Sequence, residues 1–453
     1  RERIDADAVL EQVRESAPAL AGSNGNSLTI ESGSGITTET VLADGVGGDL
    51  SLNVRIVNLR DGSSIRSTNL NFGTDLDGDG VLDVVGVGGN VTIQGTQGAS
   101  AADVVTLSGG SRVVSETIDQ GDGGRISIAA KSLDLSGHDT NDVASAITSS
   151  TTGVGLGGNV LLAVQQLRLT DGATVTSNTA GRTVTVQGLE GVGSKADSIF
   201  LSGPNSGIIF NIFGDALLGD IALHAKTISL TDEAVIQAGT SDIPGAAGNV
   251  TIDADSIDIF GGSRISSQAF SANAGQVTIM ANRLTLGNGS IETTTASETG
   301  GRGGSVVLDV GRVSLSNGAT ISSSTFATGQ AGNITMNVGT LSLADGSSIS
   351  SASTGIDAIT NPDDGTTQAP GTAGNVAITA AGSFMSDGSR VATSAEANHG
   401  GDVSLTAHSV QLSNGNLITA NSNAPLEVKE TVLIDGQLVE QVVGNGNAGN
   451  ITV

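Results

Sequence analysis

The sequence lacks cysteine, tryptophan and tyrosine, and it has only eight phenylalanines and six prolines among its 453 residues. No disulfide framework can form without cysteine. A core built on large aromatic side chains is also excluded, so valine, isoleucine, leucine and alanine must fill it. No apolar run approaches the ~20 residues of a membrane-spanning helix. The chain begins at Arg1 and shows no signal peptide, so we expect that any export signal has already been removed.

Positive charge is also scarce, because 19 basic residues stand against 46 acidic ones and give a net charge of −27. Such a chain repels the phosphates of nucleic acids and the headgroups of anionic membranes. It suits the binding of divalent cations, although acidity that only prevents aggregation explains the charge equally well. We therefore expect neither a nucleic-acid partner nor a membrane span.

The most abundant signal is an internal repeat, whose clearest copy is GNITMNVGTLSLADGSSISS from Gly332. The opening glycine falls at 219, 248, 275, 304 and 332, at intervals of 29, 27, 29 and 28 residues. Further copies open at Gly48, Gly89, Gly124, Gly158, Gly374, Gly401 and Gly449. Repeats of this length indicate a solenoid, in which each unit buries its apolar face against its neighbours.

Within each copy, apolar residues alternate with polar ones in three short runs, which is typical of strands with one buried face. One set is Val250, Ile252, Ile257, Ile259 and Ile265, and the next is Val277, Ile279, Leu284, Leu286 and Ile291. The sequence predicts an all-β parallel β-helix with three strands per coil and about a dozen coils, roughly 60 Å long at the usual strand spacing. Asp-Gly and Asn-Gly pairs supply left-handed turns at its corners. An array of β-sandwiches is the alternative.

The ends and the insertions depart from the repeat. Residues 1–21 are expected to form a helical cap or a docking segment, with Asp5 as its N-cap and Val9, Leu10 and Val13 on one face. Residues 22–453 then form the β-helix, with insertions at 61–88, 95–122, 350–373 and 421–447. Residues 424–444 predict a hairpin that turns at Asp435-Gly436. The last residues fall inside the first strand of a further coil, which indicates either an open stacking edge or a fragment of a longer protein.

One motif carries metal chemistry, the segment DLDGDGVLD from Asp75. Alternate carboxylates followed by glycine match a calcium loop, in which the Val81 carbonyl would add a further oxygen. Position 12 of such a loop is Gly86 rather than the usual glutamate, so an unliganded acidic turn is the alternative. The predicted ligands of a structural Ca²⁺ are Asp75, Asp77, Asp79, Val81 and Asp83.

Catalysis has little support. Carbohydrate-cleaving β-helices need clustered charged residues, usually beside aromatic platforms, and this chain has no tryptophan or tyrosine. Its histidines share no metal-ligand spacing, and they occupy different places in the repeat: His138, His224, His399 and His408. We predict that the chain is not an enzyme and holds no cofactor beyond calcium.

The repeats resemble filamentous haemagglutinin-type exoproteins of the two-partner secretion route. The resemblance rests on LSLADGSSISSASTG, VSLSNGATISSSTFATGQAGNITM, NAGNITV and SIFLSGPNSGIIF. It covers roughly residues 22–453 and implies a right-handed parallel β-helix that is exported across a bacterial outer membrane as an adhesin. The amino-terminal Asn-Pro-Asn-Gly signature of that family is not seen, and no catalytic residue is carried over.

These features predict an extracellular or cell-surface structural protein, a filament-forming or adhesive rod assembled by end-to-end stacking. Its expected partners are further copies, joined head to tail through the terminal coils, and a host or matrix surface ligand. A polysaccharide-binding or polysaccharide-cleaving β-helix is the alternative, as is a stalk fragment of a larger secreted exoprotein.

Overall fold

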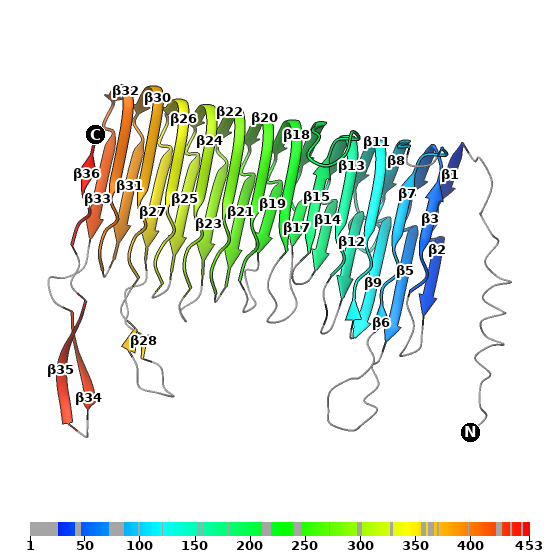
Figure 1. The fold of residues 1–453 in the computed structure, drawn as a ribbon, viewed down its shortest axis with the longest axis horizontal. Coiled ribbons are helices and arrows are strands. Elements are labelled where there is room, and N and C mark those ends of the chain that lie inside the picture. Colours follow the sequence, from blue (N-terminus) through cyan, green and yellow to red (C-terminus); the bar gives the residue numbers. More distant parts are fainter. Residues whose placement is uncertain are drawn as a thin grey trace.

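The fold is a long stack of parallel strands, described here from a computed structural model (Figure 1). It describes residues 26–40, 47–71, 86–97, 100–119, 121–151, 155, 157–178, 182–210, 219–239, 246–270, 272–296, 301–326, 329–354, 359–360, 367–368, 371–396, 398–422, 428–434, 437–444 and 447–453. Over these ranges the chain is all-β and contains no helix. None of the described segments is therefore a helix that could span a membrane.

The larger sheet has 17 strands and forms two sides of the stack. Its strands are β1 (Ser27–Ile30), β3 (Leu50–Asn53), β4 (Ile56–Leu59), β7 (Val91–Gln94), β8 (Ala102–Ser108), β11 (Ile126–Ser136), β13 (Val160–Thr170), β15 (Thr183–Gln187), β16 (Ala196–Ser202), β18 (Asp220–Thr231), β20 (Val250–Phe260), β22 (Val277–Gly287), β24 (Val306–Ser316), β26 (Ile334–Leu343), β30 (Val376–Asp387), β32 (Val403–Ser413) and β36 (Ile451–Thr452).

The third side is a sheet of 13 strands. They are β2 (Gly35–Thr40), β5 (Ser64–Asn71), β9 (Arg112–Asp119), β12 (Ala146–Thr151), β14 (Thr174–Asn178), β17 (Gly207–Phe210), β19 (Val235–Gly239), β21 (Arg264–Ala269), β23 (Ser290–Thr295), β25 (Thr320–Thr325), β27 (Ser348–Ser353), β31 (Arg390–Ala395) and β33 (Leu417–Ser422). Three separate pairs complete the described strands: β6 (Gly86–Val87) with β10 (Gly121–Asp122), β28 (Ile359–Thr360) with β29 (Thr367–Gln368), and β34 (Val428–Ile434) with β35 (Gln437–Gly444).

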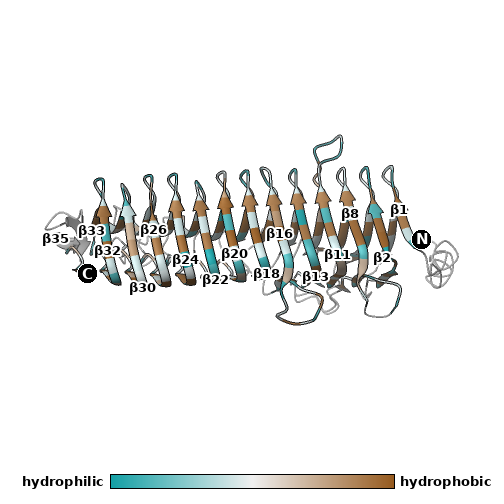
Figure 2. Cartoon of the chain, turned by 90° about the horizontal axis from the view of Figure 1, so that it is seen from above, coloured by the Kyte–Doolittle hydropathy of each residue, from teal (hydrophilic) through white to brown (hydrophobic). Residues whose placement is uncertain are grey.

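Strands that are one repeat apart pair in parallel and in register. Val250 of β20 lies beside Val277 of β22, which lies beside Val306 of β24, and the third strands β21, β23 and β25 pair in the same way. This arrangement confirms the predicted parallel β-helix, and the 13-stranded sheet agrees with the expected dozen or so coils. Hydrophobic residues recur at matching levels of successive strands (Figure 2).

Each coil has three extended segments, but in most coils the first two join into one bent strand. In β20 the ladder to β22 skips Asp255, and the buried residues Ala254 and Ile257 are three apart instead of two. This change of phase turns the apolar face around a corner. The two segments remain separate strands in three coils, as β3 and β4, β7 and β8, and β15 and β16.

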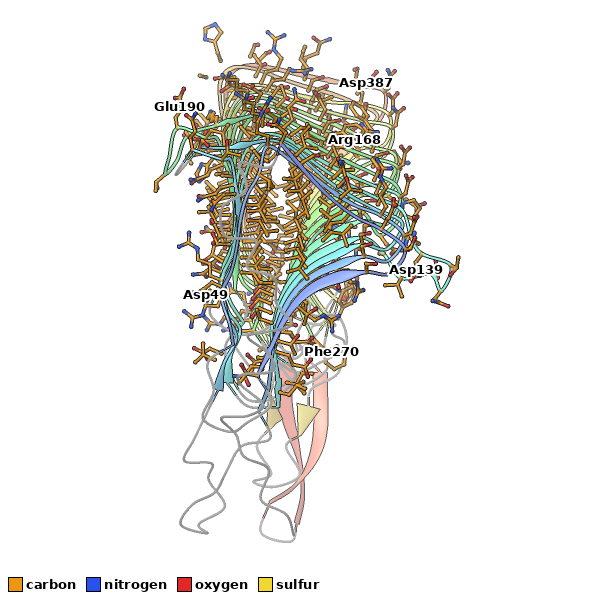
Figure 3. All side chains as sticks on the ribbon, turned by 90° about the vertical axis from the view of Figure 1, so that its right-hand side faces the viewer. Asp49, Asp139, Arg168, Glu190, Phe270 and Asp387 are labelled. Carbon is orange, nitrogen blue, oxygen red and sulfur yellow. The ribbon has the colours of Figure 1, made fainter. Side chains whose placement is uncertain are left out.

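The core is the space between these sides, where inward side chains stack in columns (Figure 3). All residues of the predicted sets are fully buried: Val250, Ile252, Ile257, Ile259, Ile265, Val277, Ile279, Leu284, Leu286 and Ile291. Small β-branched and leucine side chains fill it because every layer has nearly the same cross-section as its neighbours.

The repeating glycines form a column at one corner. A Cβ atom at Gly304 would lie 1.8 Å from the carbonyl oxygen of Gly275, and one at Gly332 would lie 1.9 Å from that of Gly304. No side chain fits at these separations, so the opening glycine is required by contact between coils.

Serines of the third strands line the interior beside this column. Serine is a typical surface residue, but alternate serines of these strands, such as Ser323 and Ser351, are fully buried. Their hydroxyls donate to the glycine carbonyls of the same coil, at 2.7 Å to Gly304 and 2.9 Å to Gly332. The backbone at this corner thus obtains partners from side chains.

The corner turns have the left-handed backbone that the sequence predicts. The φ angle is 56° at Asp171 and 54° at Asn317, and four more Asx-Gly positions of the sequence behave alike: Asp61, Asn288, Asp345 and Asn414. Asparagine and aspartate tolerate this conformation better than other residues with a Cβ atom.

On the outside, the residue after the opening glycine links neighbouring coils. The Asn249 side chain accepts a hydrogen bond from the Gln276 backbone N–H at 2.8 Å, and its Nδ2 donates to the Asp220 carboxylate at 3.1 Å.

An Asn249→Ala substitution is expected to lower the free energy of unfolding by about 1 kcal/mol, because one exposed inter-coil hydrogen bond is lost on each side, while the Asn249 backbone N–H keeps its own bond to Asp220. Urea denaturation followed by circular dichroism measures this, and a loss above ~3 kcal/mol would contradict the peripheral role.

The predicted insertion boundaries need correction. Residues 61–88 include β5, and residues 95–122 include β8 and β9, all of which are regular coil strands. The first residues of the predicted insertions 350–373 and 421–447 likewise belong to the ends of the coil strands β27 and β33. Long corners, such as 95–101 between β7 and β8, stretch the repeat and hide its strands in the sequence.

The remaining predictions about the ends are met in part by the described residues. β34 and β35 form an antiparallel hairpin within 424–444, where the sequence predicts one. The predicted cap at 1–21, and the turn residues Asp435-Gly436, lie outside the described residues.

Candidate functional site

The predicted calcium loop lies outside the described residues, because positions 72–85 include Asp75, Asp77, Asp79, Val81 and Asp83. In the described part of the chain, no three histidine or acidic side chains gather to hold a metal ion. Calcium binding therefore stays a prediction from the sequence.

One cluster of charges joins three successive coils on the outer surface. The Asp103 carboxylate lies 2.5 Å from the Arg55 guanidinium and 2.7 Å from the Lys131 ammonium. Hydrogen bonds from Lys131 and Arg55 hold the pKa of Asp103 below its usual value. The carboxylate thus stays ionised, which suits an ion pair that links coils rather than a group that transfers protons.

A second cluster fixes the corner between β15 and β16. Lys195 reaches across β18 to Asp253 and Asp255 of β20, at 3.0 Å and 2.9 Å. These hydrogen bonds, first the one to Asp255, raise the pKa of Lys195. Both clusters pair each cation with carboxylates, so neither presents a free nucleophile or base.

An open groove of about 320 Å³ lies along the bends of β24, β26 and β30. The groove forms because Gly311 and Gly339 bring no side chain to the corner. Its lining includes Asp309, Asn337 and Thr379. Its lining has a single carboxylate, whereas glycoside hydrolysis uses a pair. The groove is therefore suited to surface contact rather than to glycoside hydrolysis.

The last described coil exposes residues that every earlier coil buries. Val410 is 39 % exposed although its ladder partner Phe384 is fully buried. Leu412 is 49 % exposed and Ile451 is 47 % exposed, although their ladder partners Ser386 and Val403 are buried. Within the described ranges, β33 pairs only with β31 and β36 only with β32, so no described strand lies on the other side of either. This end face, formed by β32, β33 and β36, is an apolar surface at the edge of the described strands.

The opposite end of the rod presents the first coil. Among the described strands, β1 pairs only with β4 and β2 only with β5. β1 and β2 are mostly exposed or half-buried, and their inward residues Leu28 and Ile36 are only partly covered. The two ends therefore offer complementary faces of the same stack.

Charge is unevenly distributed around the rod. The 13 strands of the smaller sheet carry four arginines (Arg66, Arg112, Arg264, Arg390) and four acidic residues (Glu39, Glu116, Asp119, Glu292), so their net charge is 4 − 4 = 0. The chain as a whole has a net charge of −27. The acidic charge accordingly lies in the other strands, turns and insertions.

Comparison with family models, curated proteins and solved structures found no match. The resemblance to filamentous haemagglutinin-type repeats thus stays a prediction from the sequence. Sequence reasoning placed the open edge near Val453 but missed Val410 and Leu412 as end-face residues, although their alternation with polar residues carries the signal.

Proposed function

We propose that the chain is a non-catalytic structural rod of the bacterial cell surface, which assembles head to tail through its terminal coils. The end face formed by β32, β33 and β36 is the observation that carries this proposal. Its inward-facing apolar residues Val410, Leu412 and Ile451 are exposed, and no described strand covers it. The surface location is supported by the sequence resemblance alone.

The occupant we propose is the first coil of a second copy. Strands across every internal coil boundary are parallel, and a parallel boundary between two molecules requires that the last coil of one meets the first coil of the next. This contact is heterologous and does not close, so repeating it produces a filament. Burial of Val410, Leu412 and Ile451 would supply the apolar contribution.

Placing lysines in the end face tests the proposal. A chain with Val410→Lys and Leu412→Lys is expected to stay monomeric at concentrations at which the parent chain forms larger species, because two charges must be desolvated at the junction. Sedimentation velocity measures the size distribution, and negative-stain electron microscopy shows whether the larger species are fibres one rod wide.

The matched control is Val192→Lys, which introduces the same charge at a fully exposed apolar residue far from either end. This variant is expected to assemble like the parent. A parent chain that remains monomeric over the full concentration range would overturn end-to-end assembly, as would a double variant that assembles normally. Repeating the parent run with a calcium chelator shows whether the loop at Asp75 contributes.

A further inference from the structure

The outer face of the 13-stranded sheet has an unusual chemistry for this rod. Its central column runs through all 13 coils and is dominated by hydroxyl and amide groups: Thr37, Arg66, Val114, Thr148, Thr176, Ile209, Gln237, Ser266, Glu292, Ser322, Ser350, Ala392 and Thr419. Neighbouring members lie one strand spacing apart, about 4.8 Å. We call this surface the polar face.

The polar face is recessed. From β5 to β27, every outward side chain for which burial is described is buried or half-buried. Outward residues of the larger sheet, in contrast, include well-exposed side chains such as Met280 and Phe260. Viewed along the rod, the smaller sheet curves between the turn that carries Asp139 and the lower edge (Figure 3).

Unpartnered polar atoms gather at the centre of this face. Ser266 is fully buried, and its hydroxyl has no hydrogen-bond partner among the described residues. Its ladder neighbours are Gln237 and Glu292. Arg264, two residues away on the same strand, donates from Nη2 to Gln237 at 2.9 Å, while no described residue accepts from its Nε–H.

Glu292 faces this group from the next strand. Burial raises the pKa of its carboxyl, and the positive charge of Arg264 acts in the opposite direction. Because the pKa is higher in the folded state, the protonated form favours folding at acid pH, and this contribution is lost as pH rises through that pKa. At neutral pH this half-buried, partly desolvated carboxylate therefore weakens the fold, which suggests a role other than stability.

We propose that the polar face binds a neutral polysaccharide strand that lies along the rod and centres on Gln237, Arg264, Ser266 and Glu292. Arginine and serine offer donors, while glutamate and serine offer acceptors, and sugar hydroxyls serve both at once. Arg264 and Glu292 together carry no net charge, so a neutral ligand fits better than an anion or a cation. Entry of the ligand requires the long side chains above Ser266 to swing aside.

Other occupants fit less well. A polyanion meets the field of a chain with a net charge of −27. An extended peptide binds mainly through a free sheet edge or apolar pockets, whereas central strands such as β21 and β23 are paired on both sides. A second rod would gain little contact area from side chains that are already half-buried.

Without tryptophan and tyrosine the face has none of the aromatic rings on which sugars usually stack. The affinity must therefore come from many weak contacts spread over several coils. Long polysaccharides are therefore expected to bind more tightly than short oligosaccharides. This inference does not depend on the proposed end-to-end assembly, because the polar face lies along the side of the rod.

Affinity gel electrophoresis of the full chain tests it, with dextran, mannan, xylan and mixed-linkage β-glucan as soluble probes in the gel. The parent is expected to be retarded by at least one of them, and Glu292→Gln to raise the apparent dissociation constant about tenfold through loss of an acceptor for hydroxyl groups. Arg264→Met is the second variant. Asp309→Asn, which removes one charge from the outer face of the larger sheet, is the matched control and should behave like the parent.

Stability separates a binding role from a structural one. Glu292→Gln removes a desolvated charge, so its melting temperature at neutral pH should equal or exceed that of the parent while retardation falls. Migration unaffected by all four neutral polymers would overturn the proposal. Equal retardation of parent and Glu292→Gln would also overturn it, as would retardation only by heparin or by an unstructured polypeptide.

Discussion

A Gly304→Ala substitution is expected to lower the free energy of unfolding by about 3 kcal/mol or more, an effect larger than most single changes produce. The added Cβ atom would lie 1.8 Å from the carbonyl oxygen of Gly275, and the contact is with backbone, which cannot rotate away. The coils must separate at this corner. Hydrogen bonds to the Gly304 carbonyl from Ser323 and Thr293, at 2.7 and 2.5 Å, would then be strained as well.

Urea denaturation followed by circular dichroism measures this loss, and Gly318→Ala is the matched control. Gly318 has a φ of 73° but no atom within 4 Å of the added Cβ, so that change carries only the left-handed backbone penalty of about 1–2 kcal/mol. Gly304→Ala is therefore expected to lower the free energy of unfolding by more than Gly318→Ala does. Equal losses would mean that contact between coils does not explain the repeating glycine.

The sequence was sufficient to predict the fold because every coil meets the same physical demand. Glycine recurs where coils touch, and Ile252, Ile279 and Leu308 recur where one core column passes. The predicted boundaries were wrong where corners are longer, as between β7 and β8, because the interval between the opening glycines then no longer equals the usual length of a coil.

The buried serines were harder to predict. Ser351 has the composition of a surface residue, and its hydroxyl is satisfied only by the backbone of glycines 19 and 23 residues away. Alternation along β27 gives the direction of the side chain, but the polarity of serine argues against burial. Ser351 is buried because the backbone groups of the corner accept and donate its hydrogen bonds, and no local sequence pattern shows where that corner lies.

The candidate sites were even harder to predict from the sequence, because their residues meet only when the coils stack. Gln237, Ser266 and Glu292 lie 29 and 26 residues apart in the chain and become neighbours only through the register of β19, β21 and β23. No motif spacing links them. The end face is different, because alternation already identifies Leu412 as one of the apolar positions, and only the missing neighbour exposes it.

The second large effect is expected from Ser351→Ala, which removes a bridge between two coils from the interior. The Ser351 hydroxyl donates to the Gly332 carbonyl at 2.9 Å and accepts from the Gly374 N–H at 2.9 Å. The residue is fully buried, so water cannot replace either bond without entering the core. Leaving one donor and one acceptor unsatisfied is expected to lower the free energy of unfolding by about 2–4 kcal/mol.

Ser350→Ala is the matched control, because it makes the same chemical change one residue away on the outer face of β27. Its loss should stay within about 0.5 kcal/mol, as for most surface substitutions. Urea unfolding of both variants, with hydrogen exchange of the Gly374 amide, distinguishes the effects. Faster exchange at Gly374 in Ser351→Ala alone would show that side-chain hydroxyls satisfy the corner backbone. Parent-like exchange in both variants would mean that this amide has another acceptor, and that the serine column fills space without bonding the coils together.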